Sequence, residues 1–595
     1  MENEVTIRIG GESGEGVISG GDILAQAAAR WGYQVYTFRT FPAEILGGPC
    51  MFQVRISDKP VRSMGDYADV LICLNKEAYD RNIRDLRQGG VLVYDPSDFT
   101  PEPDTGDYIV YAIPFNEIAR KQIQLFQTKN MVMLGAISGL FGPPLEAIVQ
   151  LVQSKLSRSR KANETLMEKN GLALTTANAY VKEKLEKRDP YQLGAVEKAN
   201  RVVLNGNQAV VAGALAAGCG YFAGYPITPA SDIMEALAKE LPQVGGTFLQ
   251  AEDEMAALAS VLGASYGGMR AMTATSGPGL SLMAELIGLS SMAELPAVIV
   301  DAQRAGPSTG MPTKMEQSDL SFALSAGHGD TPRIVVAPAN VADCYTLMIQ
   351  AFNMAERYQM PVLFLTDQSL TARVESVDRA VFQPMQLERR AIYSNGNSNG
   401  NGHAQESKVP VGAGAVAEAF ARYAVTDSGI SPTSIPGAGA SAYVATGLEH
   451  DELGHPDYEP EDHTLMLQKR FRKLETAALE LSQPERYGAE DATIGLIGWG
   501  STEGAIQEAV DRALTLGYKV ASLHLRVLSP LPDASLKAFA ASVQKLVVPE
   551  CNYSGQLANL LGAKYGLQPI RVNKFGGIPF TSGEIVKVIE EVSQS

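Results

Sequence analysis

The sequence predicts an α/β protein with three domains, each built around a parallel-sheet core. First, 595 residues are several times the length of one usual domain. Second, short apolar segments alternate with helical patterns, which is typical of parallel sheets covered by helices. Third, a polar low-complexity stretch separates two such runs. We therefore expect domains at residues 1–190, 194–390 and 409–595, with a flexible linker at 391–408.

The composition argues against several classes of protein. The 66 acidic and 50 basic side chains give a net charge of -16, which disfavours a nucleic-acid or anionic-membrane partner. Residues 1–8 are charged and alternating, and no apolar run approaches bilayer-spanning length, so we expect a cytoplasmic protein. The five cysteines are far apart and form no C-x-x-C pair. This chain is therefore expected to hold no iron-sulfur cluster or zinc of its own.

The first domain begins with a strand at 5–9, a glycine-rich turn at 10–16 and a helix at 17–31. Such a turn holds a phosphate on its backbone N–H groups in many proteins. The dinucleotide pattern G-x-G-x-x-G is not met, because Ser19 stands where the third glycine is required. Arg39, after the next strand, would suit a phosphorylated ligand such as coenzyme A, and a tight turn with a surface arginine is an equal alternative. The remaining predicted strands are 34–38, 69–74, 91–94 and 108–113, and the helices are 76–87, 130–140, 145–156 and 162–185.

The second domain is predicted to be a parallel sheet whose loops carry polar groups. Its strands are expected at 221–225, 247–250, 270–274, 297–301, 333–336 and 362–366. Loops that follow parallel strands meet at one edge of the sheet. These loops hold Y-P-I-T-P at 225–229, E-D-E at 252–254, S-G-P-G at 276–279 and an arginine-bearing Gly/Pro loop at 303–313. Ser231 and Asp232 predict a capped helix that continues through 233–241.

The third domain contains an acidic segment followed by a second α/β pattern. His450, His455 and His463 stand among carboxylates, but their spacing matches no H-E-x-x-H helix, so a solvated acidic loop is the expectation over a metal site. The α/β pattern then predicts strands at 493–498, 519–525, 545–549 and 570–572, with helices at 503–516 and 555–565.

The order of these domains, together with Tyr-Pro-Ile-Thr-Pro at 225–229, resembles the alpha subunit of 2-oxoacid:ferredoxin oxidoreductases with a gamma domain fused at its N-terminus. The strings G-L-E-H-D-E-L-G at 447–454 and K-R-F-R-K at 469–473 are similar to those of the 2-oxoglutarate type. The resemblance implies a pyrimidine-binding central domain and a transketolase C-terminal-like last domain. It also implies a thiamine diphosphate enzyme that oxidatively decarboxylates 2-oxoglutarate with coenzyme A and ferredoxin, or catalyses the reverse carboxylation.

The resemblance further implies a partner chain. In that family a beta subunit holds the diphosphate of the cofactor, its Mg²⁺ and a [4Fe-4S] cluster, and the assembly expected is (αβ)₂. This chain has neither a G-D-G metal-binding segment nor clustered cysteines, which agrees with its being one half of a catalytic unit. The turn at 10–16 is then the candidate for capturing coenzyme A.

Four residues are the candidates for the site. Glu252 resembles the glutamate that contacts N1′ of the aminopyrimidine, and Arg304 matches the arginine that binds the substrate carboxylate. Thr228 and Thr313 resemble the hydroxyl partners of that carboxylate. The alternative role for Glu252 is to stabilise a helix by placing negative charge in its first turn. This is the only role that we assign to Asp253 and Glu254. For the two threonines, the alternative is to stabilise Pro-rich turns.

Three other functions stay open at this point. The substrate of the same enzyme type could be pyruvate or a branched-chain or aryl 2-oxoacid, because the sequence shows one candidate carboxylate arginine and no clear second. A thiamine-dependent component acting on lipoamide would need neither the glycine-rich domain nor a cluster-bearing partner. The third alternative belongs to a different class of protein: a non-catalytic scaffold that binds coenzyme A or a nucleotide.

Overall fold

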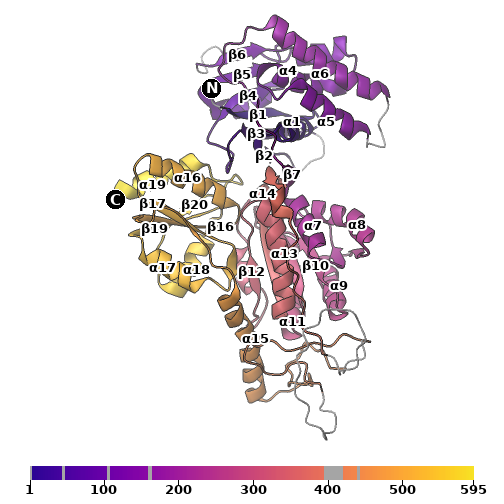
Figure 1. Cartoon of the computed structure of the whole chain (residues 1–595), viewed down its shortest axis with the longest axis vertical. Helices are drawn as coiled ribbons and strands as arrows, with labels where there is room; N and C mark the ends of the chain where they lie inside the picture. Colours follow the sequence, from indigo (N-terminus) through magenta and orange to yellow (C-terminus); the bar gives the residue numbers. More distant parts are fainter. Residues whose placement is uncertain are drawn as a thin grey trace.

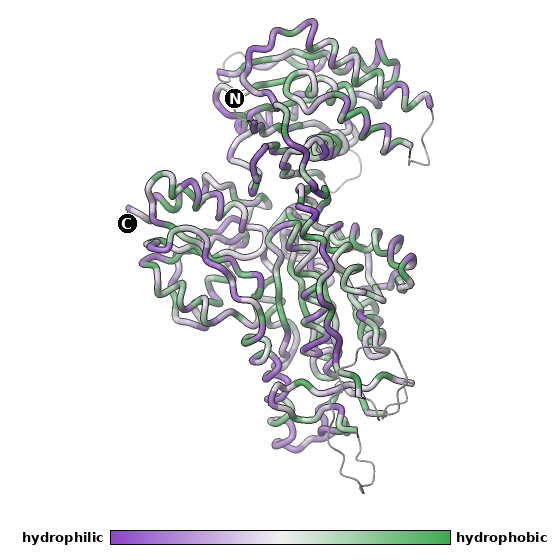
Figure 2. Tube along the Cα trace, in the orientation of Figure 1, coloured by the Kyte–Doolittle hydropathy of each residue, from purple (hydrophilic) through white to green (hydrophobic). Residues whose placement is uncertain are grey.

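The computed structural model describes residues 3–42, 47–102, 107–157, 164–393, 420–437 and 442–594. These form three sheets with helices around them, stacked from the N-terminal sheet at the top of Figure 1 to a helical and looped region at the bottom. Hydrophobic residues run along the strands inside each layer (Figure 2). The mixed α/β fold with parallel-rich sheets is thereby confirmed. Most of the predicted linker, at 394–408, lies outside the described residues.

The N-terminal sheet has eight strands in the order β6-β5-β4-β1-β3-β2-β14-β7. Strand β3 was not predicted; it lies between β1 and β2 and pairs antiparallel with both, so β1 and β2 are not neighbours. Strands β7 and β14, which were not predicted either, come from the middle of the chain and complete this sheet. The strands are β1 (Glu4–Glu12), β2 (Gln34–Thr40), β3 (Pro49–Ser57), β4 (Ala68–Cys73), β5 (Leu86–Tyr94), β6 (Ile109–Ala112), β7 (Arg201–Asn205) and β14 (Val374–Asp378).

Four longer helices cover this sheet, and the predicted helix at 76–87 is shorter than expected. It ends as α2 at Asn82, because the chain enters β5 at Leu86. The longer helices are α1 (Val17–Trp31), α4 (Lys129–Leu140), α5 (Leu145–Ser157) and α6 (Glu164–Lys184).

The central sheet has seven strands in the order β18-β12-β13-β11-β10-β8-β9. All pairs are parallel except β12–β18, so the expected parallel arrangement holds for the strands of the middle of the chain. The strands are β8 (Tyr221–Gly224), β9 (Thr247–Gln250), β10 (Ala271–Thr275), β11 (Ala297–Gln303), β12 (Ile334–Val336), β13 (Pro361–Asp367) and β18 (Val527–Ser529).

Helices lie on both faces of this sheet. The side-chain cap predicted for the helix that begins near Ser231 is wrong. Helix α8 starts at Ser231 itself, and its preceding residue, Ala230, supplies no side-chain cap. The hydroxyl of Ser231 therefore does not have the predicted capping position. The helices that matter for the site are α7 (Gly206–Ala216), α8 (Ser231–Glu240), α9 (Glu254–Tyr266), α10 (Gly277–Leu282), α11 (Ala284–Met292), α12 (Leu320–Ser325) and α13 (Val341–Tyr358).

The C-terminal sheet has five strands in the order β15-β17-β16-β19-β20, close to the predicted positions. Strand β18 comes from the same part of the chain but belongs to the central sheet, where it pairs with β12 and joins the last part of the chain to that sheet. The elements are β15 (Arg486–Gly488), β16 (Ile494–Trp499), α16 (Glu503–Thr515), β17 (Val520–Leu525), α17 (Asp533–Ala541), β19 (Lys545–Glu550), α18 (Gln556–Tyr565), β20 (Ile570–Asn573) and α19 (Ser582–Gln594).

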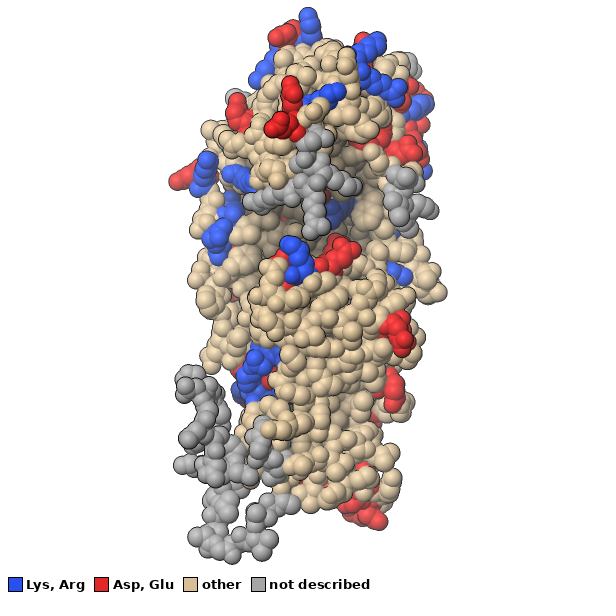
Figure 3. Space-filling view, turned by 90° about the vertical axis from the view of Figure 1, so that its right-hand side faces the viewer, with Lys and Arg blue, Asp and Glu red and all other residues tan. Residues whose placement is uncertain are grey.

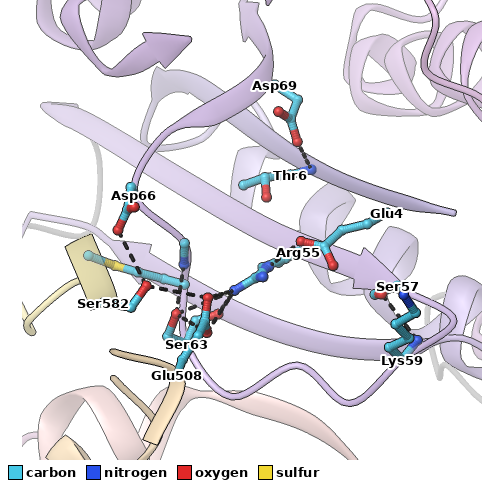
Figure 4. A network of polar contacts seen from close by, with 12 residues as sticks. Glu4, Thr6, Arg55, Ser57, Lys59, Ser63, Asp66, Asp69, Glu508 and Ser582 are labelled. Carbon is cyan, nitrogen blue, oxygen red and sulfur yellow. Dashed lines mark hydrogen bonds and ion pairs between the residues drawn. The ribbon is translucent and has the colours of Figure 1, made fainter. Parts of the chain in front are cut away.

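A polar network also ties the N-terminal and C-terminal layers together (Figure 4). The Arg55 guanidinium donates through Nη1 to both carboxylate oxygens of Glu508, at 2.9 and 3.0 Å, and the Ser63 hydroxyl donates to the same carboxylate at 2.7 Å. Asp66 accepts the backbone N–H of Gly583 at 2.7 Å. The layer that carries the glycine-rich turn is therefore held against the C-terminal layer by charged groups.

A buried ionic cluster fastens helix α15 (Pro460–Glu480) to the end of α11. Glu294 is fully buried and accepts Lys469 Nζ at 2.6 and 2.8 Å, and it also pairs with Lys473 and faces Arg422. Burial lowers the pKa of Lys473 to about 7. Although burial alone would favour a neutral acid, these cations hold the pKa of Glu294 well below its usual range. The carboxylate is the common partner of three buried cations.

Of the histidines at 450, 455 and 463, only His450 departs from the predicted solvated loop, because His455 and His463 are exposed. His450 is fully buried, its Nδ1 lies 3.0 Å from the Leu448 carbonyl, and its ring packs on Tyr423. His463 pairs with Glu449 at 2.6 Å. Within the described ranges no three histidine, cysteine or acidic side chains group as metal ligands. In the same ranges no helix is both long and apolar enough to cross a membrane.

Candidate functional site

The loops predicted to meet do leave the same edge of the central sheet. Strands β9, β8, β10 and β11 are successive parallel neighbours, so their carboxyl ends point one way. The chain after β8 carries Thr228, the chain after β9 carries Glu252, and the chain after β11 carries Arg304. The geometry of the sheet thus places the predicted residues on loops at one edge of the sheet, with β10 between the strands that lead to Thr228 and Arg304.

The Thr228 loop and Arg304 are in direct contact. Arg304 Nη1 donates to the Thr228 carbonyl at 2.7 Å, and the Thr228–Pro229 peptide bond is cis. Asn207, at the start of α7, donates its amide to the Pro229 carbonyl at 2.9 Å. Thr228 itself is exposed.

One side-chain donor of Arg304 has no partner among the described residues. The residue is only 7% exposed, and burial lowers the pKa of its guanidinium. Its Nε is buried and finds no hydrogen-bond partner within the described part of the chain. A buried donor without a partner is costly, and a carboxylate is the group that pairs with one edge of a guanidinium through two bonds. This unpaired atom is what a bound substrate carboxylate would satisfy.

The acidic triplet at 252–254 divides into three roles. Glu252 is exposed in the bend before α9. Asp253 caps α9, because its carboxylate accepts the Ala256 N–H at 2.7 Å. Glu254 is only 6% exposed, and a Cβ added at Gly279 would lie 2.5 Å from its Oε1. The structure therefore brings Glu254 to the first turn of α10, and it leaves Glu252 at the surface of this chain.

Glu254 is a residue that the sequence analysis assigned only to a helix terminus. A signal was nevertheless present in the spacing of α9. The buried residues of that helix are Glu254, Ala257, Leu258, Val261, Leu262 and Ser265, at helical intervals of three and four. Glu254 takes the first position of this inward stripe, whereas Glu252 precedes the helix.

Thr313 is engaged elsewhere in this chain. It is 8% exposed, and its hydroxyl donates to the carbonyl of Phe41 at 2.8 Å. Phe41 follows β2, so this bond joins the arginine loop to the N-terminal layer. The hydroxyl proton of Thr313 therefore points at a backbone acceptor rather than at Arg304.

The glycine-rich turn at 10–16 is filled by its own glutamate. Glu15 accepts the N–H of Glu12 at 2.9 Å and the amide of Asn75 at 3.0 Å, and it pairs with the buried Lys129 at 2.7 Å. Arg39 lies 3.4 Å from Asp22. The positive groups near this turn thus already face carboxylates of the same chain.

The side of the molecule that carries α8 and α9 has few charged side chains on its surface (Figure 3). Large apolar side chains are exposed on the site loops and the elements beside them: Tyr225, Leu249, Met255, Leu282 and Met311. Exposed apolar side chains gathered in this way are typical of a surface that another chain covers.

Three family models match the chain in the order of its layers. Residues 6–180 match "Pyruvate ferredoxin/flavodoxin oxidoreductase", residues 212–469 match "Pyruvate flavodoxin/ferredoxin oxidoreductase, thiamine diP-bdg", and residues 492–584 match "Pyruvate:ferredoxin oxidoreductase core domain II". The residues matched by the second model include all four predicted site residues.

Among curated relatives, the 2-oxoglutarate oxidoreductase subunit KorA of Mycobacterium tuberculosis is 34% identical over 99% of this chain and 91% of its own length. The alpha subunit of 2-oxoacid:ferredoxin oxidoreductase 2 of Aeropyrum pernix is 30% identical over 100% and 98%. A solved structure, the 2-oxoglutarate:ferredoxin oxidoreductase of Magnetococcus marinus with 2-oxoglutarate, coenzyme A and succinyl-CoA bound, is 40% identical, has a TM-score of 0.92, and matches 99% of this chain and 100% of that one. The family predicted from the Tyr-Pro-Ile-Thr-Pro loop is thus confirmed, and the chain belongs to the alpha subunits of 2-oxoacid:ferredoxin oxidoreductases.

Proposed function

We propose that this chain is the alpha subunit of an enzyme that oxidatively decarboxylates 2-oxoglutarate with coenzyme A and ferredoxin, or carboxylates succinyl-CoA in reverse. The observation that carries the proposal is the buried, unpaired Nε of Arg304 beside the Thr228 loop. Two similar proteins are named for 2-oxoglutarate, one of them solved with that substrate bound, and this supports the choice of substrate.

The residues present fit the aminopyrimidine side of thiamine diphosphate. Gly277 and Gly279 lie in the first turn of α10, and a Cβ at Gly279 would collide with Thr275 Oγ1 and Glu254 Oε1, so glycine at 279 lets the Glu254 carboxylate approach the start of this helix. When bound, thiamine diphosphate supplies a nucleophilic carbon and an electron sink for decarboxylation. The chain itself would contribute a carboxylate that holds a proton at N1′ of the ring.

Glu252 was the sequence candidate for that carboxylate, and we now propose Glu254 in its place. A carboxylate that exchanges a proton with a ring nitrogen needs a fixed position within hydrogen-bond reach. Glu254 is buried beside the 275–279 turn, whereas Glu252 is exposed. Arg304 would bind the substrate carboxylate through its Nε edge, and the Thr228 hydroxyl would donate to the same group. Thr313 is kept as a weaker candidate, since its proton is given to Phe41.

The rest of the site would come from a partner. We propose a beta subunit that holds the diphosphate, Mg²⁺ and a [4Fe-4S] cluster, passes electrons to ferredoxin, and assembles as (αβ)₂. The exposed apolar side chains on the site edge support such a partner. Coenzyme A would approach from the N-terminal layer, which is tied to the arginine loop through Phe41. The cytoplasmic location stays a prediction.

The test is reconstitution with the partner subunit. We expect 2-oxoglutarate-dependent, coenzyme A-dependent reduction of viologen by the complex carrying thiamine diphosphate and a loaded cluster, with pyruvate and branched-chain 2-oxoacids reacting more slowly. Arg304→Lys should raise KM about 10- to 100-fold, because a lysine keeps the charge and loses the paired donors. A loaded complex that reduces viologen with none of these 2-oxoacids would contradict the proposed function. If the complex turned over pyruvate faster than 2-oxoglutarate, the substrate would be assigned as pyruvate.

A further inference from the structure

Both chain neighbours of Arg304 are bonded to the far end of the arginine loop. Before Arg304, the Gln303 side chain accepts the N–H of Asp319 at 3.1 Å. After it, the N–H of Ala305 donates to the carbonyl of Lys314 at 3.0 Å. We call the part of the loop from Lys314 to Asp319 the return segment. The position of the Arg304 backbone therefore depends on where the return segment lies.

The return segment packs into the C-terminal layer. Met315 is only 1% exposed and lies in the same apolar core as Leu496 of β16 and Val547 of β19. Lys314 passes over Gly577, where an added Cβ would lie 2.7 Å from the Lys314 Cβ. Because a buried apolar side chain fixes the backbone that carries it, this end of the loop is attached to the C-terminal layer.

Gln317 adds four hydrogen bonds to the ends of two strands of that layer. Its side chain donates to the Trp499 carbonyl, at the end of β16, at 2.8 Å and accepts the Cys551 N–H, directly after β19, at 3.1 Å. Its own N–H donates to the Cys551 carbonyl at 2.7 Å, and its carbonyl accepts the Asn552 amide at 3.0 Å. Gln317 is fully buried, so an apolar residue in its place would leave a buried carbonyl and a buried N–H without their partner.

The C-terminal layer is shaped to receive this segment. Gly500, directly after β16, has a φ of 59°, and a Cβ there would lie 2.7 Å from Gln317 Nε2. Gln556, on α18, donates to the Ser318 carbonyl at 2.6 Å and accepts the Ser321 N–H at 2.7 Å. Two glutamine side chains, one from the loop and one from the layer, thus connect the return segment to the C-terminal layer.

We propose that Gln317 is a positioning residue for Arg304, and that the C-terminal layer, which carries none of the candidate site residues, acts in the site by holding the arginine loop. The contacts run from the ends of β16 and β19 through Gln317 to the return segment, and from there through Ala305 and Gln303 to Arg304. A guanidinium that is in place before the substrate arrives loses less conformational freedom on binding a carboxylate. The effect on binding rests on the proposed carboxylate-binding role of Arg304, whereas the holding of the loop does not.

The effect on binding is tested by steady-state kinetics of the complete complex with its partner subunit. Methionine is similar to glutamine in length and makes neither side-chain bond. Gln317→Met should raise KM for 2-oxoglutarate about 5- to 50-fold and keep kcat at saturation within about threefold, because Arg304 is kept and only its position is less defined. Phe539→Leu, which removes atoms from a buried ring on α17 of the same layer, is the control; it should lower stability and leave KM unchanged. A wild-type KM in Gln317→Met, or a loss confined to kcat, would overturn the positioning role.

The holding of the loop is tested without turnover, by hydrogen exchange of the same complexes. In Gln317→Met the amide hydrogens of residues 304–319 should exchange at least about tenfold faster than in wild type, whereas Phe539→Leu should match wild type there. Gln556→Ala removes the second connection and should speed the same exchange about two- to fivefold, which keeps the test available if Gln317→Met does not fold. Unchanged exchange in the glutamine variants would overturn the holding role. A wild-type complex that turns over no 2-oxoacid would instead contradict the proposed function, and hydrogen exchange would still decide whether the C-terminal layer holds the loop.

Discussion

Substitution of the two glutamates that differ in burial gives the sharpest test of the site. We predict that Glu254→Gln lowers kcat of the reconstituted complex about 10²- to 10⁴-fold, the range attributed to one proton-transferring group. Glu252→Gln should stay within about threefold of wild type, since an exposed side chain outside the inward stripe of α9 has no fixed position. The two substitutions are chemically the same and lie two residues apart.

The size of the expected loss follows from where Glu254 lies. Glutamine has nearly the same volume, so the buried position beside Gly279 is neither emptied nor overfilled. What changes is the ability to hold a charge and exchange a proton, and a loss of 10²- to 10⁴-fold corresponds to about 3 to 5 kcal/mol of activation free energy.

The assay is single-turnover and steady-state viologen reduction, with thiamine diphosphate binding measured separately by quenching of protein fluorescence. A large loss in Glu252→Gln with near-normal Glu254→Gln would refute the argument from burial and restore the sequence-based assignment. Normal turnover in both variants would refute an activating carboxylate on this segment.

Three further predictions concern the contacts around the site. Thr313→Val should change KM for 2-oxoglutarate by less than about threefold, because the Thr313 hydroxyl is bonded to a backbone carbonyl. A KM increase as large as that of Arg304→Lys would instead assign Thr313 to the substrate site. Glu294→Gln should lower the free energy of unfolding by about 3 to 5 kcal/mol in chemical denaturation, because three buried cations lose their counter-charge; the exposed Glu485→Gln serves as control, and equal stability of the two would contradict the cluster. Glu508→Gln should weaken the contact between the N-terminal and C-terminal layers by about 1 to 3 kcal/mol, seen as faster proteolysis within the N-terminal layer, and unchanged cleavage would argue against a stabilising role.

Local pattern was sufficient for much of the central layer. The strands around 221–225, 247–250 and 297–301 are recognisable because each is a short apolar run between helical patterns, and a parallel sheet follows from their alternation with helices. The same rule places Thr228 and Arg304 at one edge of the sheet, since the carboxyl ends of parallel strands share an edge. The Tyr-Pro-Ile-Thr-Pro string then identified the family.

Pairing between distant segments was beyond the reach of local pattern. Strands β7 and β14 join the first sheet and β18 joins the second because free sheet edges are completed by whichever backbone lies beside them, and that depends on the packing of whole layers. The same holds for Thr313, whose hydroxyl meets the Phe41 carbonyl 272 residues away.

The sequence by itself determined the α/β class, the family, and the loops from which the site is built, because these depend on periodicity and on a rare local string. Only the tertiary structure decided which acidic residue of 252–254 points inward and that Arg304 keeps a buried donor without a partner among the described residues. Burial and distance between side chains decide these points, and both are properties of packed elements rather than of any single segment.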